Sequence, residues 1–99
     1  IEYIKQHYTE FLTLDDLVRK SKLSKNHFTR TFKKEYGVTP MVYLNRYRIS
    51  VAKFLLTTTI RTSDEISHLT GFNDTSYFCS VFRKFEGVSP MQYRTKHKR

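Results

Sequence analysis

The chain has 99 residues, of which 38% are hydrophobic and 15% aromatic, and its 18 Lys and Arg outweigh 9 Asp and Glu to give a net charge of +9. This length suits one small domain or two subdomains that share an element, and it excludes large catalytic architectures such as a TIM barrel. A surface this positive attracts polyanions, so we expect nucleic acid or an acidic membrane face as the partner.

Apolar residues recur at helical spacing through the first part of the chain. We expect a first amphipathic helix within 1–11 and a second within 14–21, which Thr13 and Asp16 open as a capping box. Ser24 is expected to cap a third helix, and Gly37 to end it in the left-handed conformation. The stripes of these helices that we expect to face the core contain Ile1, Ile4, Tyr8 and Phe11, then Leu14, Leu17, Val18 and Ser21, then Phe28, either Thr31 or Phe32, and Tyr36.

A long helix is expected next. Thr39 is an N-cap with Pro40 at the first helical position, and the helix can run unbroken from Met41 to about Thr57. The β-branched residues from 57 to 60 are poor in a helix interior and should end it. Its expected buried side carries Leu44, Tyr47, Val51, Phe54 and Leu55.

The same succession of caps, stripes and stops then recurs. Adding 50 to the residue number maps Phe32 onto Phe82 and Gly37 onto Gly87. Each repeat has a short helix, a tight turn, a longer helix, a glycine and a helix opened by proline, which is the helix-turn-helix pattern. The expected boundaries in the second repeat are a capping box at Thr62 and Glu65, a corner at Gly71 and Phe72, a cap at Asn73 or Asp74, a stop at Gly87 and an opening at Ser89 and Pro90.

The predicted fold is therefore all-α. It has about seven helices in two helix-turn-helix units, homeodomain-like helical bundles joined by a long linker helix. We expect residues 1–56 to form the first subdomain with the linker and residues 57–99 the second, as one DNA-binding domain of a longer protein. A linker of roughly 17 residues spans about 25 Å, which would let two recognition helices enter successive major-groove segments.

The exposed early face of a recognition helix reaches base edges, while lysines, arginines and helix starts meet phosphates. The first unit offers long or bidentate groups to bases, whereas the second offers short ones, so the first half-site should hold most of the sequence information. The predicted base-contacting residues are Lys25, Asn26, Thr29, Arg30 and Lys33 in the first unit and Thr75, Ser76, Cys79 and Ser80 in the second. The predicted phosphate-contacting residues are Ser24, Lys34, Arg46, Arg48, Arg61, Thr62, Arg83 and Lys84.

The chain resembles the AraC/XylS-type transcription regulators from Ile1 to about Tyr93, most strongly in the second unit, where a long pattern of positions matches. Two positions depart from the small alanine usual in the first helix of each unit, namely Val18 and Ser67, and Lys22 stands where the second unit has its corner glycine. The matched positions are Ile66, Ser67, Gly71, Phe72, Tyr77, Phe78, Phe82, Arg83, Gly87, Pro90, Tyr93 and Arg94.

The resemblance implies a DNA-binding domain of a bacterial cytoplasmic regulator, usually an activator that touches RNA polymerase. It also implies a sensor, receiver or dimerisation domain N-terminal to this chain. The start at Ile1–Ile4, followed by Thr13–Asp16, resembles the subgroup attached to response-regulator receivers.

Other classes fit the sequence less well. A helical protein-interaction module would show no salt-dependent DNA affinity, and an RNA binder would expose its aromatic residues for stacking. A DNA-repair enzyme carrying this domain would need its chemistry elsewhere, because Asp64 and Glu65 suit a helix start and Cys79 has no visible base partner. We expect no enzymatic activity, cofactor or metal here, since no Cys and His spacing suits zinc. No apolar run approaches the roughly 20 residues that span a bilayer. The basic residues are spread over several short elements and not along one face of a single long helix, so we expect no membrane partner.

Overall fold

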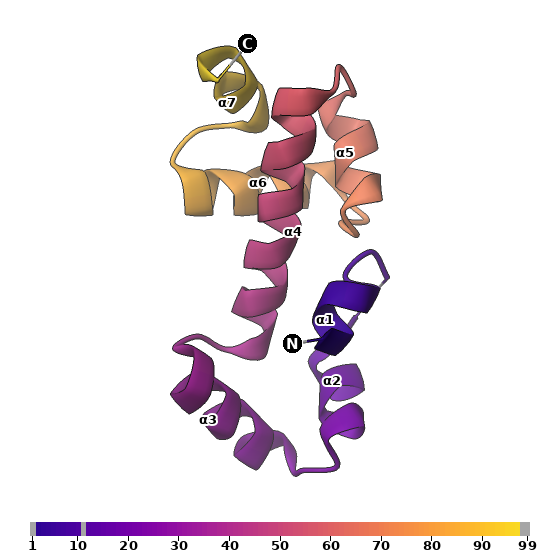
Figure 1. The fold of residues 1–99 in the computed structure, drawn as a ribbon, viewed down its shortest axis with the longest axis vertical. Coiled ribbons are helices and arrows are strands. Elements are labelled where there is room, and N and C mark those ends of the chain that lie inside the picture. The colour runs from indigo at the N-terminus through magenta and orange to yellow at the C-terminus, as the bar shows by residue number, and fades with distance from the viewer. Residues whose placement is uncertain (1, 11, 98–99) are drawn as a thin grey trace.

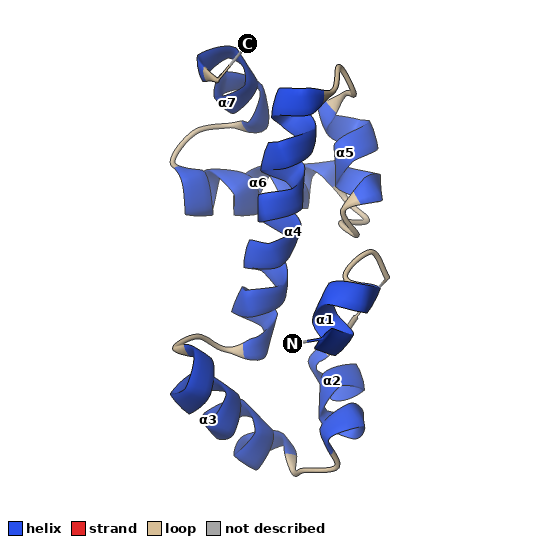
Figure 2. Cartoon of the chain, viewed as in Figure 1, coloured by secondary structure: helices blue, strands red, loops and turns tan. Residues whose placement is uncertain are grey.

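A computed structural model describes residues 2–10 and 12–97. The described residues fold into seven helices without a strand, so the predicted all-α fold with two helix-turn-helix units is confirmed (Figures 1 and 2). Ile1 and Phe11, which we expected in the first apolar stripe, lie outside the described residues. The helices are α1 (Glu2–His7), α2 (Leu14–Ser21), α3 (Lys25–Tyr36), α4 (Pro40–Thr58), α5 (Ser63–Leu69), α6 (Thr75–Glu86) and α7 (Pro90–Lys96).

Local capping chemistry sets most helix boundaries. Thr13 opens α2 with the expected capping box, in which its hydroxyl accepts from the Asp16 N–H at 3.1 Å. Asp74, rather than Asn73, caps α6, because its carboxylate accepts the Tyr77 N–H at 3.1 Å. The other expected caps and stops are confirmed at Ser24, Gly37, Thr39, Thr62, Gly87 and Ser89.

Two hydrophobic cores share α4. The first contains Ile4, Leu12, Leu17, Phe32 and Leu44. The second begins farther along the same helix and contains Ile49, Ala52, Leu56, Ile66, Phe72, Phe78, Val81 and Phe82.

The buried stripe of α4 differs from the predicted one. Leu44 is buried as expected, but Phe54 is 63% exposed, so its predicted burial is wrong. The buried row runs at intervals of four through Arg48 and Ala52 to Leu56. A charged residue and a small one interrupt the apolar pattern of this row, so the positions of the large apolar side chains located the buried side only in part.

The molecule is elongated, with principal extents of 44 × 22 × 21 Å. Its main helix–helix contacts either stay within one unit or involve α4. Figure 1 shows α1, α2 and α3 around one end of α4, with α5, α6 and α7 around the other. The linker helix therefore carries one helix-turn-helix unit at each end.

Candidate nucleic-acid interface

The recognition helix of the first unit, α3, presents a polar, basic face. Asn26, Arg30 and Lys33 are exposed, as is Lys25, whose Nζ lies 3.8 Å from an Asp15 carboxylate oxygen, while Thr29 is half-buried. Asn26, Arg30 and Lys33 are therefore accessible on the outer face of α3. The guanidinium of Arg30 and the side-chain amide of Asn26 can each form a bidentate pair with a base.

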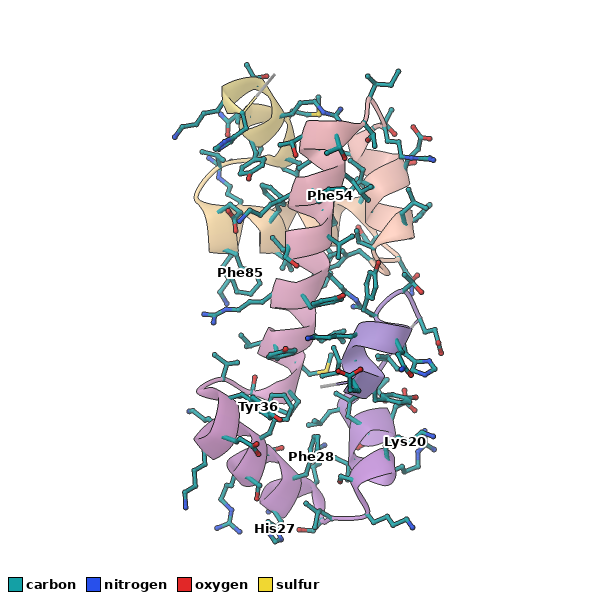
Figure 3. All side chains as sticks on the ribbon, viewed as in Figure 1. Lys20, His27, Phe28, Tyr36, Phe54 and Phe85 are labelled. Atoms are coloured by element: carbon teal, nitrogen blue, oxygen red, sulfur yellow. The ribbon has the colours of Figure 1, made fainter. Side chains whose placement is uncertain are left out.

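The inner face of α3 holds this helix against the first core. Phe32 is buried and Phe28 packs beside it, with ring centroids 5.9 Å apart. In Figure 3, Phe28 points into the space between α3 and α2, whereas His27 lies at the N-terminal end of α3. Both phenylalanines are core residues, so they are not platforms for base stacking.

The recognition helix of the second unit, α6, presents shorter side chains on its outer face, and two of them contact other parts of the protein. Ser76, Ser80 and Arg83 are exposed. Thr75 is half-buried, and its hydroxyl donates a hydrogen bond to the Asp64 carboxylate at the start of α5. Cys79 packs against the second core, where burial raises the pKa of its thiol. Two of the four predicted base-contacting residues of this unit are therefore engaged within the protein.

Arg48 is not a phosphate ligand, and that prediction is wrong. Its side chain is buried, with 6% exposed. Its Nε donates to the Tyr8 carbonyl and one terminal nitrogen to the Glu10 carbonyl, both at 2.7 Å. The guanidinium also lies over the Phe72 ring, 5.5 Å from its centroid. Because the side chain is buried and two of its nitrogens donate to backbone carbonyls inside the fold, Arg48 has a structural role.

The other Lys and Arg residues predicted to contact phosphate are all exposed, but their contacts within the protein differ. Lys34, Lys84 and Arg83 are exposed on the last turns of the two recognition helices. Arg46 is exposed and lies over the Phe85 ring, at 5.8 Å from the centroid. Arg61 is exposed as well. All five side chains are exposed, so a phosphate backbone can reach them while the domain stays folded.

Two helix starts that were predicted to meet phosphate are already capped by their own side chains. The Ser24 hydroxyl accepts the His27 N–H at 3.2 Å. The Thr62 hydroxyl accepts the Glu65 N–H at 3.1 Å, and the Glu65 carboxylate accepts the Thr62 N–H at 3.1 Å in return. That carboxylate also lies 3.6 Å from an Arg61 terminal nitrogen. The negative charge of Glu65 makes the α5 start the poorer phosphate site of the two.

The sequence did not predict the contacts that Tyr77 and Arg94 make between helices. Tyr77 on α6 is 53% exposed, and its hydroxyl oxygen lies 3.3 Å from the Asn45 side-chain nitrogen on α4. Arg94 on α7 donates to the Leu56 carbonyl at 2.9 Å and to the Thr59 carbonyl at 3.1 Å, which caps the end of α4. No local signal marks either contact, since both join residues more than thirty positions apart.

The described residues contain no group of three His, Cys, Asp or Glu that could hold a metal ion. None of the helices in this part of the chain is long and apolar enough to cross a bilayer.

Comparison with known proteins places this arrangement in a family. A family model described as a helix-turn-helix domain matches residues 17–96. The uncharacterized HTH-type transcriptional regulator YisR of Bacillus subtilis is 36% identical over 92 residues, which are 93% of this chain and 32% of that protein. The chain therefore spans about a third of the length of this relative.

Two solved structures are similar over most of both chains. The C-terminal domain of AraT, a response regulator from Geobacillus stearothermophilus, is 31% identical with a TM-score of 0.94, covering 99% of this chain and 82% of that one. The DNA-binding domain of AdpA, solved in complex with a target DNA, is 27% identical with a TM-score of 0.92, covering 97% and 86%. With two helix-turn-helix units on one linker helix, this chain belongs to the AraC/XylS family of helix-turn-helix transcription regulators.

Proposed function

We propose that this domain binds specific double-stranded DNA and regulates transcription, with α3 and α6 in successive major-groove segments. One observation carries the proposal: a free, basic outer face on α3 is paired with a second helix-turn-helix unit at the other end of one helix. At 19 residues, α4 is longer than expected. Its length of about 28 Å supports two recognition helices placed roughly one helical turn of DNA apart.

We further propose that the two units divide the work unequally. Arg30 and Asn26 are exposed on α3 and can each form bidentate pairs with a base. On α6, Thr75 is engaged with Asp64 and Cys79 with the core, which leaves Ser76 and Ser80 as short base-edge candidates. The first half-site should therefore hold most of the sequence information, with the second unit acting mainly on phosphates and DNA shape.

Selection of duplexes from a random pool, followed by replacement of each base pair in turn, tests this proposal. Penalties should concentrate in the half-site under α3, and equal penalties in both half-sites would contradict the asymmetry. Affinity should also fall steeply with salt, because phosphate neutralisation releases counterions. A log–log slope near zero would remove the DNA-binding proposal itself.

Two substitutions on α3 separate base contacts from phosphate contacts. Arg30→Ala should cost roughly 1–3 kcal/mol of binding free energy and relax one base position. Lys34→Ala removes the same charge on the same helix and should weaken all duplexes about equally. Fluorescence anisotropy against the selected site and its single-base variants measures both. If Arg30→Ala weakens every duplex alike, its base contact is misassigned.

We propose that this domain is the DNA-binding output of a longer cytoplasmic bacterial protein. The similarity to the AraT response-regulator domain supports an N-terminal receiver or sensor, and contact with RNA polymerase would make the protein an activator. Pull-down of RNA polymerase by the full-length protein on promoter DNA tests the second statement.

A further inference from the structure

We propose that Arg48 and Gly71 form a junction that fixes how the two recognition helices are placed relative to each other. Arg48 is then a positioning residue that sets which spacing of DNA half-sites the protein accepts. The inference rests on the proposed two-half-site binding of DNA.

A single helix does not by itself define this placement. The main helix–helix contacts run within each unit or to α4, so the units would otherwise depend on α4 alone. Small bends in a helix of 19 residues would then change the separation and the relative rotation of α3 and α6. A second connection beside α4 would remove that freedom.

The loop after α1 supplies this connection (Figure 1). It belongs to the first unit, yet it lies directly against the turn between α5 and α6. A Cβ atom built on Gly71 would lie only 2.2 Å from the Tyr8 carbonyl oxygen, and 3.0 Å from both the Arg48 Nε and the Thr9 Cα. Backbone of one unit therefore touches backbone of the other, at a residue without a side chain.

Arg48, on α4, contacts both the loop after α1 and the turn between α5 and α6. Its guanidinium donates to the Tyr8 and Glu10 carbonyls of the loop, while its central carbon lies over the ring of Phe72, the residue after Gly71. The partners of Arg48 in turn contact the recognition helix of each unit, directly or through a neighbouring helix. Phe72 is 2% exposed and lies against Phe78 of α6, with ring centroids 5.2 Å apart. On the other side, Leu12 lies in the first core and Thr13 caps α2, which packs on α3.

Arg48 suits this role better than a lysine would. A planar guanidinium can donate in two directions and still present a flat face to an aromatic ring, whereas an ammonium can do only part of this. The neighbouring Arg46 is exposed and lies over Phe85 instead. It provides a matched control on the same helix, with the same charge and a different contact.

Binding to duplexes with altered half-site spacing tests the junction. Each base pair added or removed turns the second half-site by about 34° around the helix axis. The natural protein should prefer one spacing, with affinity about tenfold lower at one base pair more or fewer, because either the DNA or the protein must deform. Arg48→Met should flatten this preference, while Arg46→Met should weaken all spacings by the same factor.

Arg48→Lys and Phe72→Leu keep the proposal testable if Arg48→Met does not fold. Both should flatten the spacing preference in protein that circular dichroism shows to be folded. A role in stability alone would lower the melting temperature and leave the ratio of affinities between spacings unchanged, which would overturn the proposal. A natural protein that binds its site but tolerates every spacing would overturn it too. Failure of the natural protein to bind any duplex would instead contradict the proposed function.

Discussion

At the residue scale, the two helix-turn-helix turns solve one backbone problem with different residues. Lys22 after α2 has φ 61°, and Gly71 after α5 has φ 91°. The left-handed region is costly for a side chain with a Cβ and nearly free for glycine. The substitution of lysine for the corner glycine therefore leaves the turn left-handed but strained.

Lys22→Gly should relieve this strain. We expect the free energy of unfolding to rise by about 0.5–1 kcal/mol, since the relief exceeds the added flexibility of the unfolded chain. Thermal and urea unfolding measure the change. Lys22→Ala removes the charge but keeps the left-handed residue non-glycine, so it serves as the control.

The opposite change, Gly71→Ala, should destabilise, because it adds both the strain and the clash with the Tyr8 carbonyl. Equal stability of the natural protein and Lys22→Gly would contradict a strained turn.

At the element scale, two short helices depend on charged caps. In α2 and α5, hydrogen bonds from the backbone and hydroxyl of Thr13 and Thr62 lower the pKa of Asp16 and Glu65 below their ordinary values of 3.8 and 4.5. The ionised carboxylates therefore favour the folded state. This contribution is complete above the ordinary pKa values and is lost as pH falls through the lower folded values.

Asp16→Asn and Glu65→Gln should flatten the pH dependence of stability below about pH 4.5, because each removes one linked proton. Melting temperatures measured between neutral and strongly acidic pH give the two curves. Glu35→Gln, outside the capping boxes, controls for the loss of one carboxylate. A double variant with the same acid dependence as the natural protein would refute the linkage.

The sequence predicted best those helix boundaries that are set by residues close together in the chain. Capping boxes, glycine stops and proline openings involve residues within a few positions of each other, so their chemistry is visible in the sequence. The two-unit architecture was predictable because its pattern occurs twice.

The roles of individual side chains were harder to predict because they depend on partners far along the chain. Arg46 and Arg48 look alike in sequence, yet one is exposed and the other is bound to carbonyls forty and thirty-eight positions away. Thr75 was expected to face DNA, and only the packing of α6 on α5 shows its hydroxyl bound to Asp64. The charge pattern predicted a polyanion partner, but it did not show which Lys and Arg side chains would contact that partner.

At the scale of the whole molecule, the two cores meet along α4. Leu44 belongs to the first core, whereas Ile49, Ala52 and Leu56 belong to the second. We therefore propose that the second subdomain begins within α4, near Ile49, and not after residue 56.

Matched Ile→Val substitutions test where the subdomains divide. Ile4 is 2% exposed in the first core and Ile66 is fully buried in the second, and each substitution should cost about 0.5–1.5 kcal/mol. Ile66→Val should speed amide hydrogen exchange in α5, α6, α7 and the second half of α4. Ile4→Val should instead affect α1, α2, α3 and the first half. Equal acceleration everywhere would show one cooperative unit.

The half-buried thiol of Cys79 on α6 provides a chemical probe of whether the second unit is occupied. Cys79 is the single cysteine of the chain, so any thiol reagent can label only one position. Burial raises its pKa, and since the thiolate is the reacting form, alkylation of the resting fold should be slow compared with a free thiol. A ligand laid across the outer face of α6 would slow the labelling further, so occupancy of the second unit could be followed without attaching a dye.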